Sequence, residues 1–303
     1  MGLAPNVSIV ILTKNAGPNF RATLTKIYDQ QTELSFELII VDSGSTDESL
    51  GIANEFPVRR FTIKPHEFNF GLTRNLGFSL ARGEYIVTIS QDATPYDRKW
   101  LENLIRPFLM NPNVVAVQGV TRFPLDRPVF YWEKFGTFYF TSETKRWGGY
   151  EHRLSFVNCG IRRAFWENHR ISYTPFSEDK LFARQVQAAG LQIVEAKDAI
   201  CVHGHEYTFL GLVKRLLGEG IGWAYAGVEY GLKDCLGDIV KNKWMFRVSL
   251  RALRRREMTS LHELLFPFVR PICIFWGNKR VMEDLLFKPR PDHRREPPKR
   301  QRV

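Results

Sequence analysis

The stretch Val7-Ser-Ile-Val-Ile-Leu-Thr-Lys-Asn15 decides the fold class. Its first six residues are almost all apolar, with four β-branched among them, which is typical of a strand buried on both faces of a sheet. Two further runs of this kind follow, Glu37–Val41 and Glu84–Ile89. Segments with helical spacing separate the runs, so the sequence predicts an α/β domain with a mostly parallel, Rossmann-like sheet. The expected strands are 7–12, 37–41, 58–63, 84–89, 114–120, 191–195 and 199–202, and the expected helices are 19–30, 48–56, 71–81, 100–110 and 180–189.

Polar side chains follow the predicted strands where each strand ends. Thr13, Lys14 and Asn15 follow the first strand, Asp42 ends the second, and Gln91 and Asp92 come after the fourth. Ligands of open α/β sheets bind at the carboxyl ends of the strands, so these residues are candidates for a binding crevice. No GxGxxG follows the first strand, which argues against a dinucleotide oxidoreductase. Asp42 has two interpretations, an acceptor for the N3–H of a uracil or thymine and a turn aspartate that caps a helix.

A second group of residues predicts phosphate and metal chemistry. Arg74 lies in the first turns of a predicted helix, where a guanidinium is placed either to clamp a diphosphate or to pair with a surface acid. Asp92 is a carboxylate that suits a divalent metal, and His203 and His205 follow a strand. Glu178 and Asp179 precede a helix, either as functional acids or as charges that complement the helix dipole.

Several short motifs occur in a fixed order along the chain. They are VSIVILTKN (7–15), IIVDSGSTD (39–47), TRNLG (73–77), ARGEYI (81–86), SQDATP (90–95), SEDK (177–180) and HGH (203–205). Over about residues 6–210 the series resembles family 2 glycosyltransferases of the GT-A fold. The run EFNFGLTRN (67–75), together with SQDATP, resembles their bacterial rhamnosyltransferase-like branch.

The resemblance implies an enzyme with a nucleotide-sugar donor, Mg2+ or Mn2+, and inverting transfer. It implies Asp179 as the catalytic base, Asp92 as a metal ligand, and His203 or His205 as the other protein ligand, with His203 preferred because it lies nearer the strand end. The residues expected to hold the donor are Thr13, Asn15 and Asp42 at the base and ribose, Arg74 at the diphosphate, and Ser45, Gln91, Asn158 and Glu178 around them. Trp132, Trp147 and Tyr150 are aromatic residues for sugar stacking or for core packing.

Two positions depart from the family pattern. Most members carry Asp-x-Asp after the fourth strand, whereas here Ser90 replaces the first acid and only Asp92 remains. The rhamnosyl branch often has His where Phe70 stands in this chain. The first departure affects the ribose and metal contacts, and the second affects the identity of the sugar more than the reaction.

Charge is distributed unevenly along the chain. The protein has 303 residues and a net charge of +11, of which the 20 Lys+Arg and 11 Asp+Glu from Glu206 onward contribute +9. Helices that mix apolar and basic residues are expected from 208 to about 287, and they suit either an anionic membrane surface or a dimer and core-covering subdomain. The expected division is 1–95 and 96–207 as the donor-binding and acceptor-binding halves of a GT-A domain, 208–287 as a helical extension, and 288–303 as a disordered basic tail. On this interpretation the residues before 206 carry out the chemistry, and the residues after it bring the enzyme to a membrane surface or a partner subunit.

The cysteine spacing and the missing sequence signals limit the choice of cell compartment and of binding partners. Cys159, Cys201, Cys235 and Cys273 show no CxxC spacing, and no signal peptide or 18-residue apolar span is visible, which favours the cytosol, either free or at the inner face of the cell membrane. No nucleic-acid reading motif accompanies the basic residues. The best functional prediction is transfer of L-rhamnose from dTDP-rhamnose to a glycan or lipid-linked glycan in cell-surface polysaccharide synthesis. The alternatives are another donor (UDP-Gal, UDP-Glc or UDP-GlcNAc) and a non-catalytic scaffold that binds sugar nucleotides; the oligomeric state stays open.

Overall fold

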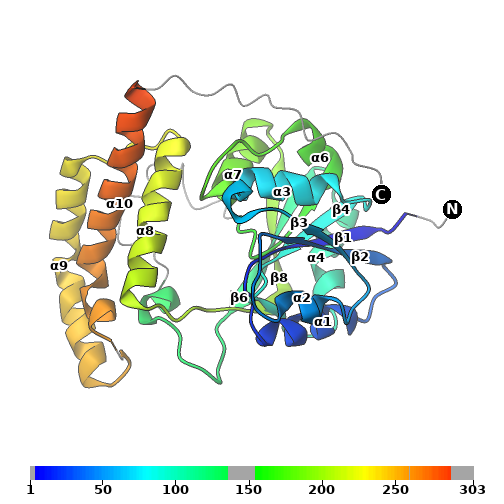
Figure 1. Ribbon diagram of the computed structural model, residues 1–303, viewed down its shortest axis with the longest axis horizontal. Coiled ribbons are helices and arrows are strands. Elements are labelled where there is room, and N and C mark those ends of the chain that lie inside the picture. The colour runs from blue at the N-terminus through cyan, green and yellow to red at the C-terminus, as the bar shows by residue number, and fades with distance from the viewer. Residues whose placement is uncertain (1–3, 136–153, 259, 288–303) are drawn as a thin grey trace.

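The computed structural model describes residues 4–135, 154–258 and 260–287, without the side chains of 283–287, and shows an α/β body with three long helices beside it (Figure 1). The elements of the body follow the order that the hydrophobic pattern predicts. They are β1 (Val7–Thr13), α1 (Asn19–Tyr28), β2 (Phe36–Asp42), α2 (Ser49–Ala53), β3 (Val58–Thr62), α3 (Phe70–Ser79), β4 (Tyr85–Ile89), β5 (Thr94–Pro95), α4 (Trp100–Met110), β6 (Val114–Arg122), β7 (Asn158–Arg162), α6 (Arg163–Asn168), α7 (Glu178–Ala188) and β8 (Gln192–Val202).

One sheet of eight strands, in the order β3-β2-β1-β4-β7-β6-β8-β5, runs through the body. The pairs β1–β2, β1–β4, β2–β3 and β6–β8 are parallel, whereas β7 is antiparallel to both of its neighbours and β5 is antiparallel to β8. The four parallel pairs confirm the expected GT-A type of sheet. Because β4 and β8 lie in the same sheet, the residues that follow them reach the same edge although they are far apart in sequence.

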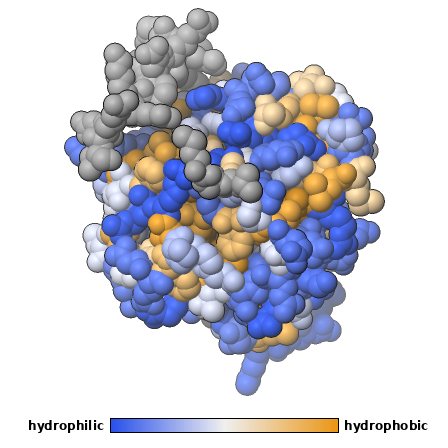
Figure 2. Space-filling model, turned by 90° about the vertical axis from the view of Figure 1, so that its right-hand side faces the viewer, coloured by the Kyte–Doolittle hydropathy of each residue, from blue (hydrophilic) through white to orange (hydrophobic). Residues whose placement is uncertain are grey.

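Helices cover both faces of this sheet (Figure 1). Alternate residues of β1 show the division, since Ile9 and Ile11 pack with α1, α2 and α4, while Val10 packs with α3, α6 and α7. Both faces of the central strands are therefore buried, which explains their continuous apolar sequences. The face of the body turned away from the long helices is mostly hydrophilic, with apolar side chains in smaller groups (Figure 2).

Some expected boundaries were wrong. The expected strands 191–195 and 199–202 form the single strand β8, because a register irregularity against β6 carries the chain through the polar residues between them. The helix expected at 48–56 covers only Ser49–Ala53, and α7 begins at Glu178, two residues earlier than expected. The predictions for Trp147, Tyr150 and the tail 288–303 concern residues outside the described part of the chain.

The C-terminal region forms three long helices, α8 (Phe209–Tyr225), α9 (Leu232–Arg254) and α10 (Leu261–Phe287). Helix α10 packs against both α8 and α9, and α8 lies nearest the body (Figure 1). Trp132 is fully buried and donates its indole N–H to the carbonyl of Glu263 in α10, so it serves core packing, one of the two roles considered for it. Within the described residues, no helix is long and apolar enough to cross a bilayer.

Candidate active site

The loops after β1 and β2 are joined by a set of hydrogen bonds. The amide of Asn15 donates to Ser45 Oγ at 2.8 Å, and Asn15 Oδ1 accepts from the amide of Thr46 at 2.8 Å. Asn15 has a left-handed φ of 48°, which asparagine tolerates better than most residues and which aims its side chain at the neighbouring loop. The hydroxyl of Thr13 is buried and lacks a hydrogen-bond partner among the described residues. Three of the predicted donor-binding residues thus lie together at one edge of the sheet.

Asp42 uses its carboxylate within its own loop. Its oxygens accept from the amide of Gly44 at 2.9 Å, the amide of Ser45 at 3.0 Å and the hydroxyl of Ser45 at 2.5 Å, and the residue is completely buried. These contacts correspond to the turn aspartate, one of the two interpretations left open. Gln91 behaves similarly, because its amide group both accepts from the N–H and donates to the C=O of Lys14, at 2.8 and 3.1 Å.

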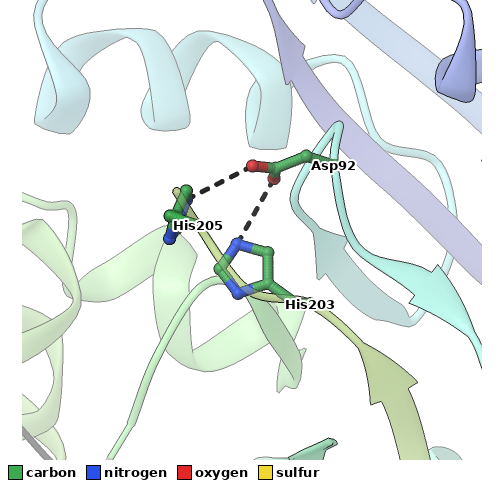
Figure 3. Close-up of side chains that lie close together, drawn as sticks. All are labelled: Asp92, His203 and His205. Atoms are coloured by element: carbon green, nitrogen blue, oxygen red, sulfur yellow. Dashed lines mark ion pairs between the residues drawn. The ribbon is translucent and has the colours of Figure 1, made fainter. Parts of the chain in front are cut away.

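Asp92, His203 and His205 converge from distant segments (Figure 3). Asp92 follows β4, whereas His203 directly follows β8 and His205 lies two residues further on. Asp92 Oδ1 lies 3.4 Å from His203 Nε2, and Asp92 Oδ2 lies 3.3 Å from His205 Nε2. One ligand atom of each residue lies within 4.8 Å of the others, as three ligands of one metal ion require. Both predicted histidines therefore reach Asp92, and the structure brings the three predicted metal ligands together.

Glu133 supports this cluster and is absent from the residues singled out in the sequence. Its carboxylate lies 2.9 Å from His205 Nδ1, accepts the backbone N–H of His205 at 3.0 Å, and accepts the hydroxyl of Tyr207 at 2.9 Å. A proton held at Nδ1 by Glu133 leaves the Nε2 lone pair of His205 free for a metal, an arrangement common among metal-binding histidines. Glu133 lies in the aromatic segment 122–149, which has no periodicity, and its only signal there is an acid between Trp132 and Lys134.

The charges of the cluster influence one another. Burial opposes ionisation of Asp92, but the contacts with His203 and His205 outweigh it and hold the pKa of Asp92 well below its usual range. Burial lowers the pKa of His205, yet Asp92 and Glu133 raise it to about 9. The two carboxylates thus supply the negative charge that a cation would share.

Arg74, Glu178 and Asp179 form a second polar group at the start of α7. Arg74 Nε lies 3.3 Å from Glu178 Oε1, and both side chains are buried. Atom Nη1 of Arg74 is also buried and has no hydrogen-bond partner among the described residues. Ser177, just before Glu178, has a left-handed φ of 62° that presents the first turn of the helix to this group. Burial raises the pKa of both acids, that of Glu178 to about 7, with repulsion by Asp179 as a further cause.

Asn158, one of the residues expected around the donor, lies inside the sheet in this structure. It begins β7, is completely buried, and its amide accepts from Trp100 Nε1 at 2.9 Å and donates to the carbonyls of Val120 and Ala199 at 3.1 and 3.0 Å. Both N–H groups of its side-chain amide are thus donated to carbonyls of neighbouring strands, so the side chain holds the sheet together.

The helical extension takes part in the site. A cavity of about 190 Å³ next to the histidines is lined by the body and by helices α8 and α10. Arg270 forms an ion pair with Glu219, and Arg215 Nε lies 3.7 Å from the same carboxylate. Further candidates that the sequence pattern missed, because their segments show no motif, are Tyr207, Arg215, Glu219 and Arg270.

Helix α8 also holds the segment that precedes Asp179. Gly222 lies against Phe176, and a Cβ atom at Gly222 would come within 2.7 Å of the Phe176 Cβ and 2.8 Å of its carbonyl oxygen. The Phe176 ring packs edge-on against Phe70 at the start of α3. The segment before the acids of α7 is therefore clamped between α3 and α8.

Comparison with known proteins identifies the family. The sequence model described as glycosyl transferase family 2 matches residues 8–169, more than half of the chain. The chain belongs to glycosyl transferase family 2. This family 2 chain is a glycosyltransferase of the GT-A fold, as its sequence predicts.

Two similar sequences are O-antigen chain rhamnosyltransferases. That of Salmonella anatum is 28% identical over 220 residues, which cover 67% of this chain and 68% of the relative. That of Salmonella typhimurium is 27% identical over 219 residues, which cover 67% of each chain. Within family 2 the chain thus resembles a rhamnosyltransferase-like branch.

Solved structures with the same fold include enzymes with nucleotide sugars and metal. A mannosyltransferase of Pyrobaculum calidifontis, in complex with GDP-Man and Mn2+, has a TM-score of 0.54 and 17% identity and covers 94% of this chain and 75% of its own. Glucosyl-3-phosphoglycerate synthase of Mycobacterium tuberculosis, with Mn2+, UDP-glucose and phosphoglyceric acid, has a TM-score of 0.57 and 16% identity and covers 74% of this chain and 81% of its own. At these identities the likeness establishes the fold.

Proposed function

We propose that the protein is an inverting, metal-dependent rhamnosyltransferase that transfers L-rhamnose from dTDP-rhamnose to a glycan or lipid-linked glycan. The observation that carries the proposal is the convergence of Asp92, His203 and His205 after β4 and β8. In an open α/β sheet this edge is where ligands bind, and it lies beside the joined loops of Asn15 and Ser45. The proposed surroundings are cell-surface polysaccharide synthesis at the cytoplasmic side of the membrane.

The donor set fits a divalent cation and favours Mn2+ over Mg2+. One carboxylate and two imidazoles offer one oxygen and two nitrogen ligands, whereas Mg2+ is usually held by carboxylates, phosphates and water. Glu133 orients His205 as a supporting carboxylate of a metal site does. The chemistry that a bound cation supplies is neutralisation of charge on the leaving nucleoside diphosphate.

The chain's own residues have distinct roles in the proposed reaction. Asp179 accepts the proton of the acceptor hydroxyl as this attacks the anomeric carbon from the face opposite the diphosphate. The buried environment that raises the pKa of Asp179 makes it a stronger proton acceptor than an exposed aspartate. Arg74 keeps Glu178 paired and offers its unpartnered Nη1 toward an anion. Thr13, Asn15, Ser45 and Gln91 are proposed to line the base and ribose site, with Asp42 shaping its loop.

Rhamnose as the sugar rests on the two Salmonella relatives and on the run EFNFGLTRN with SQDATP. The experiment is a panel of dTDP-rhamnose, UDP-Gal, UDP-Glc and UDP-GlcNAc, each added with Mn2+ and with Mg2+, scored by thermal unfolding and by release of the nucleoside diphosphate. A donor present at about 100 times its Kd stabilises the fold by about 2.7 kcal/mol. Stabilisation by a UDP-sugar without dTDP-rhamnose would shift the proposal to that donor.

The same assay separates the enzyme from a scaffold that only binds sugar nucleotides. A scaffold is stabilised by donor and metal but releases no nucleoside diphosphate with any acceptor glycan. Turnover that persists in full after thorough chelation would contradict the metal dependence.

We further propose residues 1–95 as the donor half and 96–207 as the acceptor half of the body, since the donor loops follow β1 and β2 and the base lies on α7.

A further inference from the structure

Ten large apolar side chains of α9 and α10 are exposed, and six of them follow one another from the end of α9 into α10. The exposed fractions of these six run from 37% to 68%, and we call them the apolar face; they are Leu250, Leu253, Leu261, Leu265, Ile272 and Trp276. Their spacings of three, four and seven residues within each helix keep each set on one side of its helix. The rings of Phe246 and Phe268, with centroids 6.0 Å apart, join the two helices at this surface. Water-exposed apolar surface of this extent marks a site of interaction.

Among the side chains that the structure describes, exposed cations outnumber exposed acids around the apolar face, where Glu257 in the loop between the helices is an exposed acid. Exposed lysines and arginines are spread along both helices. They are Lys233, Lys241, Lys243, Arg247, Arg251 and Arg254 on α9, and Lys279 and Arg280 on α10. Of the acids on α9 and α10 whose side chains are described, Asp238 and Glu263 are buried and Asp234 is half-buried. Each of these three is engaged, with Tyr230, Tyr131 and Gly231 respectively.

The positive charge around the apolar face favours an anionic partner. Contact between two copies of this face would bring cations against cations and is disfavoured. The basic tail, with seven Lys+Arg in residues 288–303, is repelled for the same reason. An anionic bilayer offers apolar acyl chains to the apolar residues and phosphate headgroups to the cations. Lys279 illustrates the arrangement, since this exposed residue holds its ammonium 5.4 Å from the ring centre of Trp276.

We propose that the apolar face of α9 and α10 docks the protein on an anionic lipid surface. The helices then lie in the plane of the interface, with the six apolar residues at the acyl boundary and the cations at the headgroups. This holds the body at the membrane without a spanning helix. The inference concerns the helical extension and does not depend on the donor sugar or on the metal.

The test is cosedimentation of the full chain with vesicles of phosphatidylcholine alone and with vesicles containing phosphatidylglycerol. Wild type binds the second kind, and raising the salt concentration weakens binding. Arg247→Gln removes one cation from the surface and weakens binding about fivefold. Ile272→Glu places a charge in the apolar face and weakens binding by more than that. Matched controls on the body, Lys26→Gln and Met110→Glu, bind as wild type does, since these residues are also exposed.

Thermal unfolding of each variant checks that it is folded. Equal binding to both kinds of vesicle, or unchanged binding of Ile272→Glu and Arg247→Gln, would overturn the proposal. Sedimentation velocity measures the oligomeric state of wild type and variant. If wild type is a dimer and Ile272→Glu dissociates it, the apolar face binds a second copy of the chain instead.

Discussion

The body and the helical extension use their charged residues in opposite ways. In the body the functional charges are paired, Asp92 with two histidines and Arg74 with Glu178. On the outer side of α9 and α10 the cations are exposed, and the acids of these helices whose side chains are described are buried or half-buried. The inner side of the extension resembles the body, because Arg270 pairs with Glu219 next to the histidines.

This comparison bears on the expected boundary between chemistry and placement near residue 206. Helix α8 lines the cavity beside His205 and holds Phe176, so the extension contributes to the site. The division between chemistry and placement therefore runs through the helical extension, between its inner and outer sides. Variants of inner residues should change catalysis, and variants of outer residues should change location only.

The largest effect is expected from Asp179→Asn. Loss of the general base should lower the rate of sugar transfer by about 10²- to 10⁴-fold, while donor binding persists because the amide keeps the shape of the side chain. Transfer is measured by product formation, and binding is measured by thermal shift with the donor. Transfer at the wild-type rate would remove Asp179 as the base.

The next effect is expected from Glu133→Gln. Without the carboxylate, His205 loses the partner that fixes its tautomer, and the affinity for Mn2+ should fall about 10- to 100-fold. Titration calorimetry with Mn2+ measures the change, with Glu33→Gln as a control because Glu33 is an exposed acid elsewhere on the body. Equal Mn2+ affinity in Glu133→Gln and wild type would show that the contact with His205 is structural only.

The sequence predicts the body well because continuous apolar runs and strand-end motifs are local signals. It predicts Asp92, His203 and His205 because each follows a recognisable strand. It misses Glu133 and Glu219, whose roles come from tertiary contacts between segments without periodicity. The sequence does not reveal the hydrogen bonds of Asn158 inside the sheet, because these depend on contacts with Trp100, Val120 and Ala199 far away in the chain. The apolar face is visible only when the exposure of each helical residue is known.

A smaller effect is expected from Gly222→Ala in α8. The added Cβ would meet the backbone and Cβ of Phe176, and the resulting strain should destabilise the protein by about 1–3 kcal/mol and slow transfer through the displaced start of α7. Gly237→Ala is the matched control, because no atom lies within 4 Å of the added Cβ and alanine favours the helix by about 0.5–1 kcal/mol. Denaturant unfolding and transfer rates measure both. If the two variants are equally stable and equally active, α8 does not position the site.

The smallest effect is expected from Glu178→Gln, and it appears in the pH dependence of stability. Burial raises the pKa of Glu178 from 4.5 to about 7 in the folded protein. Between these values the unfolded chain has released a proton that the folded chain still holds, so the free energy of unfolding falls as pH rises through this range. Glutamine does not titrate, so the slope in the variant should be shallower; part of it remains because burial also raises the pKa of Asp179. Denaturant unfolding from pH 4.5 to 8 gives the slopes, and Glu33→Gln should run parallel to wild type. If Glu178→Gln also runs parallel, the ion pair with Arg74 compensates burial fully, and Glu178 is as well paired as the acids of the metal cluster.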